Sequence, residues 1–163
     1  MKLIAAVSEN WGIGKDNRLL FSIPKDMQFF REKTIGKTVI LGRKNLESFP
    51  GGKPLKNRTN VVLTRDKNFQ RDGVITVNSI DELLKLDCVD ENAFVIGGES
   101  IYRGLLDYCD LCYITKVHET AKSDKFMVNL DERADWQLLS ETEQIEDNGH
   151  IISFCVYKRQ DRV

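Results

Sequence analysis

The chain has 163 residues, which is enough for one globular domain with a buried core and too few for two domains of ordinary size. Its 24 lysines and arginines nearly balance its 25 aspartates and glutamates, and they form no basic block of the kind that binds nucleic acid. We therefore expect a single domain, residues 1–163, that binds a small molecule. Nothing in the sequence requires an assembly larger than a monomer.

The apolar run near the start of the chain, residues 3–7, is too short for a signal peptide because it breaks at Ser8-Glu9-Asn10. No other stretch approaches the length that a membrane helix needs. We expect a cytoplasmic protein that contacts neither a membrane nor a nucleic acid.

Short runs rich in valine, isoleucine and leucine alternate with helix-like segments. The runs predict buried strands at residues 3–7, 38–41, 60–63, 74–77, 93–96 and 111–117. Helices are expected from Pro24 to Thr34, after Gly42, over residues 79–86 with Ser79 and Glu82 at capping-box spacing, and after Gly98. This alternation predicts an α/β fold with a mainly parallel sheet that is covered on both faces.

The end of the chain follows a different pattern. Two longer segments, residues 136–146 and 150–158, flank Asn148-Gly149, which is a strong hairpin signal. We therefore expect a central, mainly parallel sheet of eight strands, closed by an antiparallel C-terminal hairpin and flanked by about four helices.

The four cysteines and two histidines show no metal-binding pattern. Cys109 and Cys112 have the spacing of a pair, but a zinc site needs further ligands and a redox pair needs to open a helix after a strand. His118 and His150 have no cysteine or carboxylate near them in a ligand pattern. We predict reduced thiols and no metal site.

Residues 95–100, Val-Ile-Gly-Gly-Glu-Ser, run from an apolar strand end through two glycines into a helix that begins near Ser100. Adjacent glycines let a ligand approach the backbone closely, and the free N–H groups that begin a helix attract anions. The pattern therefore suggests a phosphate-binding turn, although an ordinary tight turn between a strand and a helix has the same pattern.

Cations follow two other predicted strands, in Gly42-Arg43-Lys44 and Thr64-Arg65. Ligands of open α/β sheets collect beyond the carboxyl ends of the strands, so these cations and Gly97-Gly98 favour one extended anionic ligand. They are more numerous than a pyrophosphate needs, which favours a further phosphate such as the 2′-phosphate of NADP. Taken singly, each cation also fits an exposed surface charge. No Gly-x-Gly-x-x-Gly follows the first strand, so the usual Rossmann fingerprint does not apply.

Asp26 lies in the first turn of the first predicted helix. A carboxylate there complements the helix dipole, which is a sufficient structural reason for it. Met27 and Phe30 follow one and four positions later, so the carboxylate could instead border an apolar slot. There it could hold an amidine-like heterocycle through two hydrogen bonds, or promote proton delivery to it.

Several motifs occur in a characteristic order. They are Leu3-Ile4-Ala5-Ala6, Gly12-Ile13-Gly14, residues 17–26, residues 39–44, Val62-Leu63-Thr64-Arg65 and Val95-Ile96-Gly97-Gly98. In this order and spacing the chain resembles the dihydrofolate reductase family, of the bacterial chromosomal type, along essentially its whole length. The resemblance implies reduction of 7,8-dihydrofolate to tetrahydrofolate by hydride transfer from NADPH, and antifolate inhibitors as further ligands.

The resemblance also implies roles for residues of the substrate site. Asp26 would bind the pterin and favour protonation at N5, Thr115 would support it through a hydrogen bond, and Leu19 and Phe21 would complete the catalytic set. Arg58 would take the α-carboxylate of the glutamate tail, a task suited to a planar guanidinium. The substrate would contact Ile4, Ala6, Asp26, Met27, Phe30, Phe49, Leu55, Arg58, Ile96, Tyr102 and Thr115.

For the cofactor, the resemblance implies a cis peptide bond between Gly97 and Gly98 and a mobile loop, residues 13–20, that closes over NADPH. The residues that would contact NADPH are Ala6, Ile13, Gly14, Asn17, Leu19, Gly42, Arg43, Lys44, Asn45, Leu63, Thr64, Arg65, Ile96, Gly97, Gly98, Glu99, Ser100, Ile101 and Tyr102.

The chain departs from the family pattern at three places. Phe21 stands where many bacterial members carry tryptophan, and phenylalanine cannot donate a hydrogen bond. Leu20 replaces a frequent proline, and residues 125–127 lack another. The sequence therefore does not predict whether this later segment contacts the 13–20 loop.

Two other functions fit part of the pattern. A pterin or pyrimidine reductase of the same fold would act on a different heterocycle, but it would not need Arg58 unless its substrate carried a carboxylate. A non-catalytic NADPH-binding protein would have no use for Asp26 together with Thr115.

Overall fold

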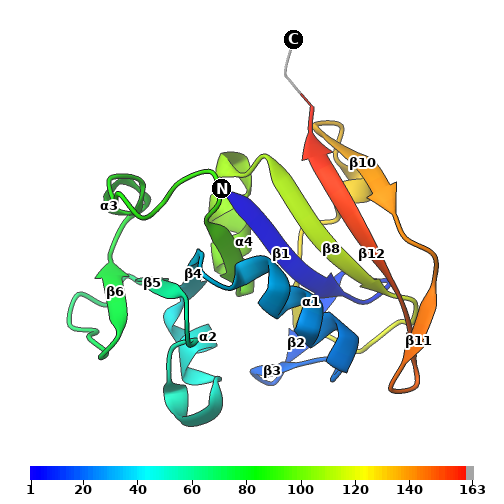
Figure 1. Ribbon diagram of the computed structural model, residues 1–163, viewed down its shortest axis with the longest axis horizontal. Helices are drawn as coiled ribbons and strands as arrows, with labels where there is room; N and C mark the ends of the chain where they lie inside the picture. The colour runs from blue at the N-terminus through cyan, green and yellow to red at the C-terminus, as the bar shows by residue number, and fades with distance from the viewer. Residues whose placement is uncertain (161–163) are drawn as a thin grey trace.

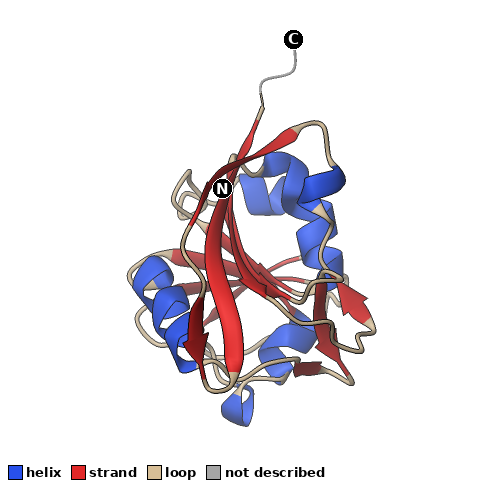
Figure 2. Ribbon diagram, turned by 90° about the vertical axis from the view of Figure 1, so that its right-hand side faces the viewer, coloured by secondary structure: helices blue, strands red, loops and turns tan. Residues whose placement is uncertain are grey.

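The computed structural model describes residues 1–160, so residues 161–163 of the expected domain lie outside the described part of the chain. Its described residues form a nine-stranded sheet with helices on both faces (Figure 1, Figure 2). The order is β10-β12-β8-β1-β7-β4-β5-β6, with β11 also paired to β12. The strands are β1 (Lys2–Val7), β4 (Thr38–Gly42), β5 (Thr59–Leu63), β6 (Val74–Val77), β7 (Phe94–Gly97), β8 (Leu111–Val117), β10 (Trp136–Glu141), β11 (Ile145–Asp147) and β12 (His150–Arg159).

The strand directions confirm the expected α/β class. Strands β8, β1, β7, β4, β5 and β6 run parallel to their neighbours, whereas β12 is antiparallel to β8, β10 and β11. At the turn between β11 and β12, Asp147 pairs with His150, and Asn148 and Gly149 both have positive φ. This is the two-residue hairpin that the Asn-Gly signal predicted.

The strand count differs from the eight expected, because the predicted strand 136–146 forms two strands, β10 and β11, within the described sheet. After Trp136 every residue of β10 is exposed, and the register shifts between Leu138 and Ser140. A strand without a buried face has little to fix its register, so it bulges and breaks easily. Eight strands still lie side by side across the sheet, and β10 and β11 share the outer edge of β12.

The four expected α-helices are present in the described chain: α1 (Pro24–Thr34), α2 (Arg43–Glu47), α3 (Ile80–Leu84) and α4 (Glu99–Leu105). Neighbouring residues of a strand point to opposite faces of a sheet. Accordingly, Ile4 packs in a cluster that includes Leu46 of α2 and Phe30 of α1, whereas Leu3 packs with Leu105 of α4. Each face is therefore covered by two helices, since Leu83 of α3 belongs to the same cluster as Leu3.

The start of α1 is held by a distant hairpin. Ile23, which precedes the helix, has no side-chain oxygen with which to cap it. Instead, a carboxylate oxygen of Asp147 accepts a hydrogen bond from the backbone N–H of Lys25 at 2.7 Å, and Asn148 Nδ2 donates to the carbonyl of Ser22 at 2.7 Å. The turn between β11 and β12 thus takes the place of an N-cap side chain. The backbone N–H that it binds belongs to Lys25, the residue before Asp26.

A second, three-stranded sheet was not predicted. It consists of β2 (Gly12–Lys15), β3 (Arg18–Leu19) and β9 (Lys125–Phe126) in the order β3-β2-β9. Asp124 N–H donates to the carbonyl of Gly14, and Asp16 N–H donates to Asp124 Oδ2, each at 3.0 Å. Lys125 also pairs with Gly14, so the segment after Asp124 contacts the 13–20 loop even though it lacks the proline that the resemblance led us to expect.

The remaining sequence predictions concern thiols, histidines and membranes. The four cysteines are free, and burial raises the pKa of Cys109 to about 12, which keeps it protonated. His150 is not isolated in space, because its Nδ1 lies 2.9 Å from Glu119 Oε1. Among residues 1–160 there is no cluster of metal ligands, and no helix is long and apolar enough to cross a membrane.

Candidate active site

Asp26 and Thr115 meet where the first turn of α1 reaches the central sheet. Thr115 Oγ1 donates a hydrogen bond to Asp26 Oδ1 at 2.6 Å, as the sequence led us to expect, and Thr115 is only 1% exposed. Burial raises the pKa of the Asp26 carboxyl, and the hydrogen bond from Thr115 opposes this shift without outweighing it. The result is a partly buried carboxyl group that takes up a proton more readily than an exposed aspartate.

Apolar side chains lie on the same face of the sheet as Asp26. Ile4 of β1 and Ile96 of β7 are buried in one cluster, against which Phe30, Phe49 and Leu55 pack. Phe30 follows Asp26 by four residues, so the two share one side of α1. The structure thus gathers five of the seven apolar residues expected to line the substrate.

The other two apolar candidates differ in position. Ala6 is half-buried and pairs in register with Thr115 across β1 and β8, which places both side chains on the same face. Met27 is 64% exposed and does not pack in the cluster. It lies on the open side of the first turn of α1.

Tyr102 connects the apolar site to the glycine turn. Its hydroxyl donates to the carbonyl of Ile4 at 2.7 Å, and its ring lies 3.2 Å from where a Cβ on Gly97 would stand. Burial, with a further contribution from the charge of Asp26, raises the pKa of Tyr102 well above its ordinary value. Tyr102 is therefore a protonated hydroxyl that fixes the middle of β1 against α4.

Arg58 lies toward the C-terminal end of α1. Its Nε is 3.3 Å from Thr34 Oγ1, Nη1 donates to the carbonyl of Lys56 at 3.0 Å, and the guanidinium is 6.0 Å from the centre of the Phe30 ring. Burial, and then the charge of Arg31, lower the pKa of Arg58. The Asp26 carboxyl at the start of α1, the Phe30 ring in its middle and the Arg58 guanidinium beside its end therefore follow one another along the helix.

The expected phosphate-binding residues gather at one edge of the main sheet. Strands β7, β4 and β5 are neighbours and parallel, so Gly97, Gly42 and Thr64, at or just after their ends, lie at the same edge. The Gly97–Gly98 peptide bond is cis, as expected. A Cβ placed on Gly98 would meet no atom within 4 Å, so the backbone there is open to a ligand.

Cations and one amide border this edge. Arg43 begins α2 and pairs with Glu47 at 3.1 Å, while Lys44 and Arg65 are exposed. Asn45 Nδ2 donates to the carbonyl of Ile96 at 3.3 Å, which ties α2 to the end of β7. The remaining expected contacts of the cofactor are half-buried Leu63 and Thr64, half-buried Glu99, exposed Ser100 and buried Ile101.

The 13–20 loop carries a further group of candidates. Ile13 and Gly14 lie in β2, and Asn17 occupies the turn to β3 with a positive φ. Leu19, in β3, is 82% exposed. The structure does not bring Leu19 into any of the buried clusters of the described chain.

Phe21 packs away from the apolar cluster that contains Ile4. Its ring contacts the His150 ring edge-on at 5.2 Å and packs against buried Ile23 and Ile152. Phenylalanine at this position therefore joins the base of the 13–20 loop to β12.

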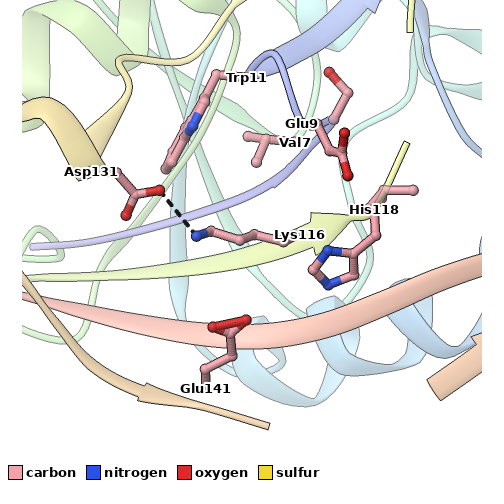
Figure 3. A pocket seen from close by; sticks show the side chains of 9 residues that line it. Val7, Glu9, Trp11, Lys116, His118, Asp131 and Glu141 are labelled. Atoms are coloured by element: carbon pink, nitrogen blue, oxygen red, sulfur yellow. Dashed lines mark hydrogen bonds and ion pairs between the residues drawn. The ribbon is translucent and has the colours of Figure 1, made fainter. Parts of the chain in front are cut away.

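A separate cavity of about 200 Å³ lies on the opposite face of the sheet (Figure 3). Val7 and Lys116 border it, and both alternate along their strands with Ala6 and Thr115, which face Asp26. Lys116 Nζ bonds Asp131 Oδ2 at 3.1 Å. Neither Asp26 nor Thr115 lines this cavity, and no sequence pattern indicated it.

Residues of the β11–β12 turn are the part of the site that the sequence did not reveal. Asp147 and Asn148 hold the backbone just before Asp26. Their Asn-Gly turn was recognised as a hairpin signal, but no local pattern links that hairpin to α1.

Comparisons with known proteins agree with this arrangement. The family model described as dihydrofolate reductase matches residues 1–159. A dihydrofolate reductase of Bacillus subtilis is 34% identical over 163 residues, covering 99% of this chain and 95% of the relative, and one of Staphylococcus haemolyticus is 38% identical, covering 98% and 95%.

A solved structure is also similar. Dihydrofolate reductase from Enterococcus faecalis, complexed with NADP(H) and RAB-propyl, has a TM-score of 0.87 and 34% identity, covering 98% of this chain and 96% of that one. With matches that span nearly the whole chain in sequence and in fold, this chain belongs to the dihydrofolate reductase family.

Proposed function

We propose that residues 1–163 form one dihydrofolate reductase domain that reduces 7,8-dihydrofolate to 5,6,7,8-tetrahydrofolate with NADPH. The observation that carries the proposal is the partly buried Asp26 carboxyl, bonded to Thr115 beside an apolar cluster, with Arg58 against the C-terminal end of α1. Family membership supports it, and the Enterococcus faecalis relative is complexed with NADP(H).

The spacing of groups along α1 suits the chemistry of the substrate. Dihydrofolate has an amidine-like pterin edge, an aromatic linker and an anionic tail, in that order. Asp26 pairs with the pterin edge, Phe30, Phe49 and Leu55 contact the aromatic linker, and Arg58 takes the α-carboxylate of the tail. Ile4, Ala6, Met27, Ile96 and Tyr102 complete the contacts of the substrate.

Asp26 binds the substrate and influences its protonation. Thr115 donates its hydrogen bond to Oδ1 of Asp26, so Oδ2 can accept a hydrogen bond from the pterin edge. In apolar surroundings such hydrogen bonds are strong and hold the ring in one orientation. The negative charge of Asp26 favours the protonated form of the nearby N5. Leu19 lies on the 13–20 loop, which excludes water from the reacting ring, and Phe21 holds the base of that loop against β12.

The residues at the glycine edge fit a dinucleotide with a third phosphate. Open backbone at Gly98 suits the pyrophosphate, and Arg43, Lys44 and Arg65, with Thr64, suit the adenosine 2′-phosphate. NADPH, when bound, supplies the hydride. Around it the chain's own residues orient and cover the ligand, with Ile13, Gly14 and Asn17 contributed by the loop and Gly42, Asn45, Leu63 and Ile101 by the sheet edge.

The cellular role follows from the reaction. The protein supplies tetrahydrofolate for one-carbon metabolism and acts in the cytoplasm as a monomer. Antifolate inhibitors that present an amidine-like edge to Asp26 compete with dihydrofolate for this site.

The proposed reaction is tested by following the absorbance of NADPH with the purified protein, with and without dihydrofolate, and again with NADH. We expect loss of NADPH that depends on dihydrofolate. We also expect a clear preference for NADPH over NADH, because Arg43, Lys44 and Arg65 suit the 2′-phosphate that NADH lacks. Binding of NADPH without its oxidation would leave the cofactor assignment standing and refute the substrate assignment. Other pterins and pyrimidines would then be the substrates to examine.

Replacing Asp26 tests its proposed part in protonation. Asp26→Asn keeps a group that accepts from Thr115 but removes the charge, so turnover at pH 7 should fall by about a hundredfold or more. The loss should shrink toward acid pH, where the substrate is already protonated. Steady-state rates across a pH series measure this, with exposed Asp72→Asn as the matched control. An unchanged rate of Asp26→Asn at pH 7 would refute the role.

Arg58 is tested with two substrates. Arg58→Ala removes a charged, bidentate partner, so the KM for dihydrofolate should rise roughly ten- to a hundredfold. The KM for a pterin without the glutamate tail should not change. The KM of Arg58→Lys for dihydrofolate should lie between those of the parent protein and of Arg58→Ala, because a lysine keeps the charge and loses the planar fork. Equal effects on both substrates would remove Arg58 from the site and would favour a reductase of a different heterocycle.

A further inference from the structure

Glu99 makes a contact that crosses between two parts of the fold. It is the first residue of α4 and follows the Gly97-Gly98 turn directly. Its Oε2 accepts a hydrogen bond from the backbone N–H of Phe126 at 2.6 Å, in a partly buried position. A bond to an ionised carboxylate at this distance is short and strong, and partial burial reduces competition from water.

Phe126 belongs to the small sheet that carries the 13–20 loop. It pairs with Gly12 of β2, and Lys125 pairs with Gly14. Strand β2 in turn pairs with β3, where Gly14 lies opposite Leu19. Backbone pairs, with a register shift between Gly12 and Gly14, therefore join the residue bonded by Glu99 to the 13–20 loop.

The small sheet is also anchored near β1 in the described chain, where Gly12 N–H donates to Ser8 Oγ at 2.9 Å and Ser8 N–H donates to the carbonyl of Gly12 at 3.1 Å. Met127 N–H donates to the carbonyl of Trp11 at 2.9 Å, and both side chains are buried in the main core. These contacts fix the end of the small sheet nearest β1. The Glu99 bond fixes β9 to the corner at which Gly97 and Gly98 lie.

We propose that Glu99 is a positioning residue that docks the β2–β3–β9 sheet onto the Gly97-Gly98 corner and so couples retention of the cofactor to closure of the 13–20 loop. This inference rests on the proposed function for its cofactor. Glu99 acts through the backbone of β9: without the carboxylate, the Phe126 N–H loses its partner and the loop leaves the glycine corner more often. The cofactor then escapes faster, while the Asp26 end of the site is unaffected.

Two variants separate this role from simple loss of stability. Glu99→Ala removes the acceptor, whereas Glu99→Gln keeps an amide oxygen at the same length that can accept from Phe126. Exposed Glu91→Ala is the matched control for the loss of a surface carboxylate. Each is compared by amide hydrogen exchange of the ligand-free protein, by NADPH affinity, and by the KM for dihydrofolate.

In Glu99→Ala we expect exchange at Phe126 and at residues 12–19 to be roughly tenfold faster or more, and NADPH binding to be weaker by a similar factor. The KM for dihydrofolate and the exchange of β1 and β8 should match the parent protein. Glu99→Gln should restore most of the slow exchange and most of the NADPH affinity of the parent protein. Glu91→Ala should match the parent protein in both measurements.

Unchanged exchange at Phe126 and residues 12–19 in Glu99→Ala would overturn the proposal, whatever happens to NADPH affinity. Faster exchange without weaker NADPH binding would overturn the coupling. If Glu99→Ala does not fold, Glu99→Asp, whose shorter side chain cannot reach Phe126 at the same distance, gives the same comparison. A parent protein that binds no NADPH would refute the proposed function, a result distinct from the exchange measured without ligand.

Discussion

The hydrogen bond from Thr115 to Asp26 joins the central sheet to the first turn of α1 and places a carboxyl group where water is scarce. Burial of this carboxyl opposes folding, as the raised pKa of Asp26 indicates. The surrounding structure must therefore hold α1 firmly by other means. Phe29 and Phe30 pack the helix on the sheet, and Asp147 caps its start from a distant hairpin.

The parallel sheet explains how the residues proposed to bind the cofactor come together. Because β5, β4 and β7 are adjacent and parallel, the glycines and cations that follow them meet at one edge, although they are far apart in the sequence. Tyr102 connects that edge to β1 through the carbonyl of Ile4. The β2–β3–β9 sheet, docked by Glu99, brings the 13–20 loop to the same corner.

Local signals predicted much of this fold. Pro24 and Thr34 marked the two ends of α1, and Ser79 caps α3 by accepting from Glu82 N–H. Apolar runs that alternate with helical segments predicted the parallel strands. The small sheet was missed because β3 and β9 have two residues each and β2 is half glycine, so no periodic pattern exists. The contacts of Asp147 and Glu99 join side chains to the backbone of distant segments, and such pairs leave no trace in the local sequence.

The proposed role of Asp26 requires a partly buried carboxyl that costs the folded protein stability. The direct test is the free energy of unfolding of Asp26→Asn and of the parent protein, measured by denaturant titration as a function of pH. Burial raises the folded-state pKa of Asp26 above its ordinary value of 3.8, so ionisation destabilises the folded protein as the pH rises through that raised pKa. The asparagine variant should be the more stable protein at neutral pH, and its advantage should fall away below pH 3.8. A variant that is less stable at neutral pH, or whose difference from the parent does not change with pH, would contradict the account.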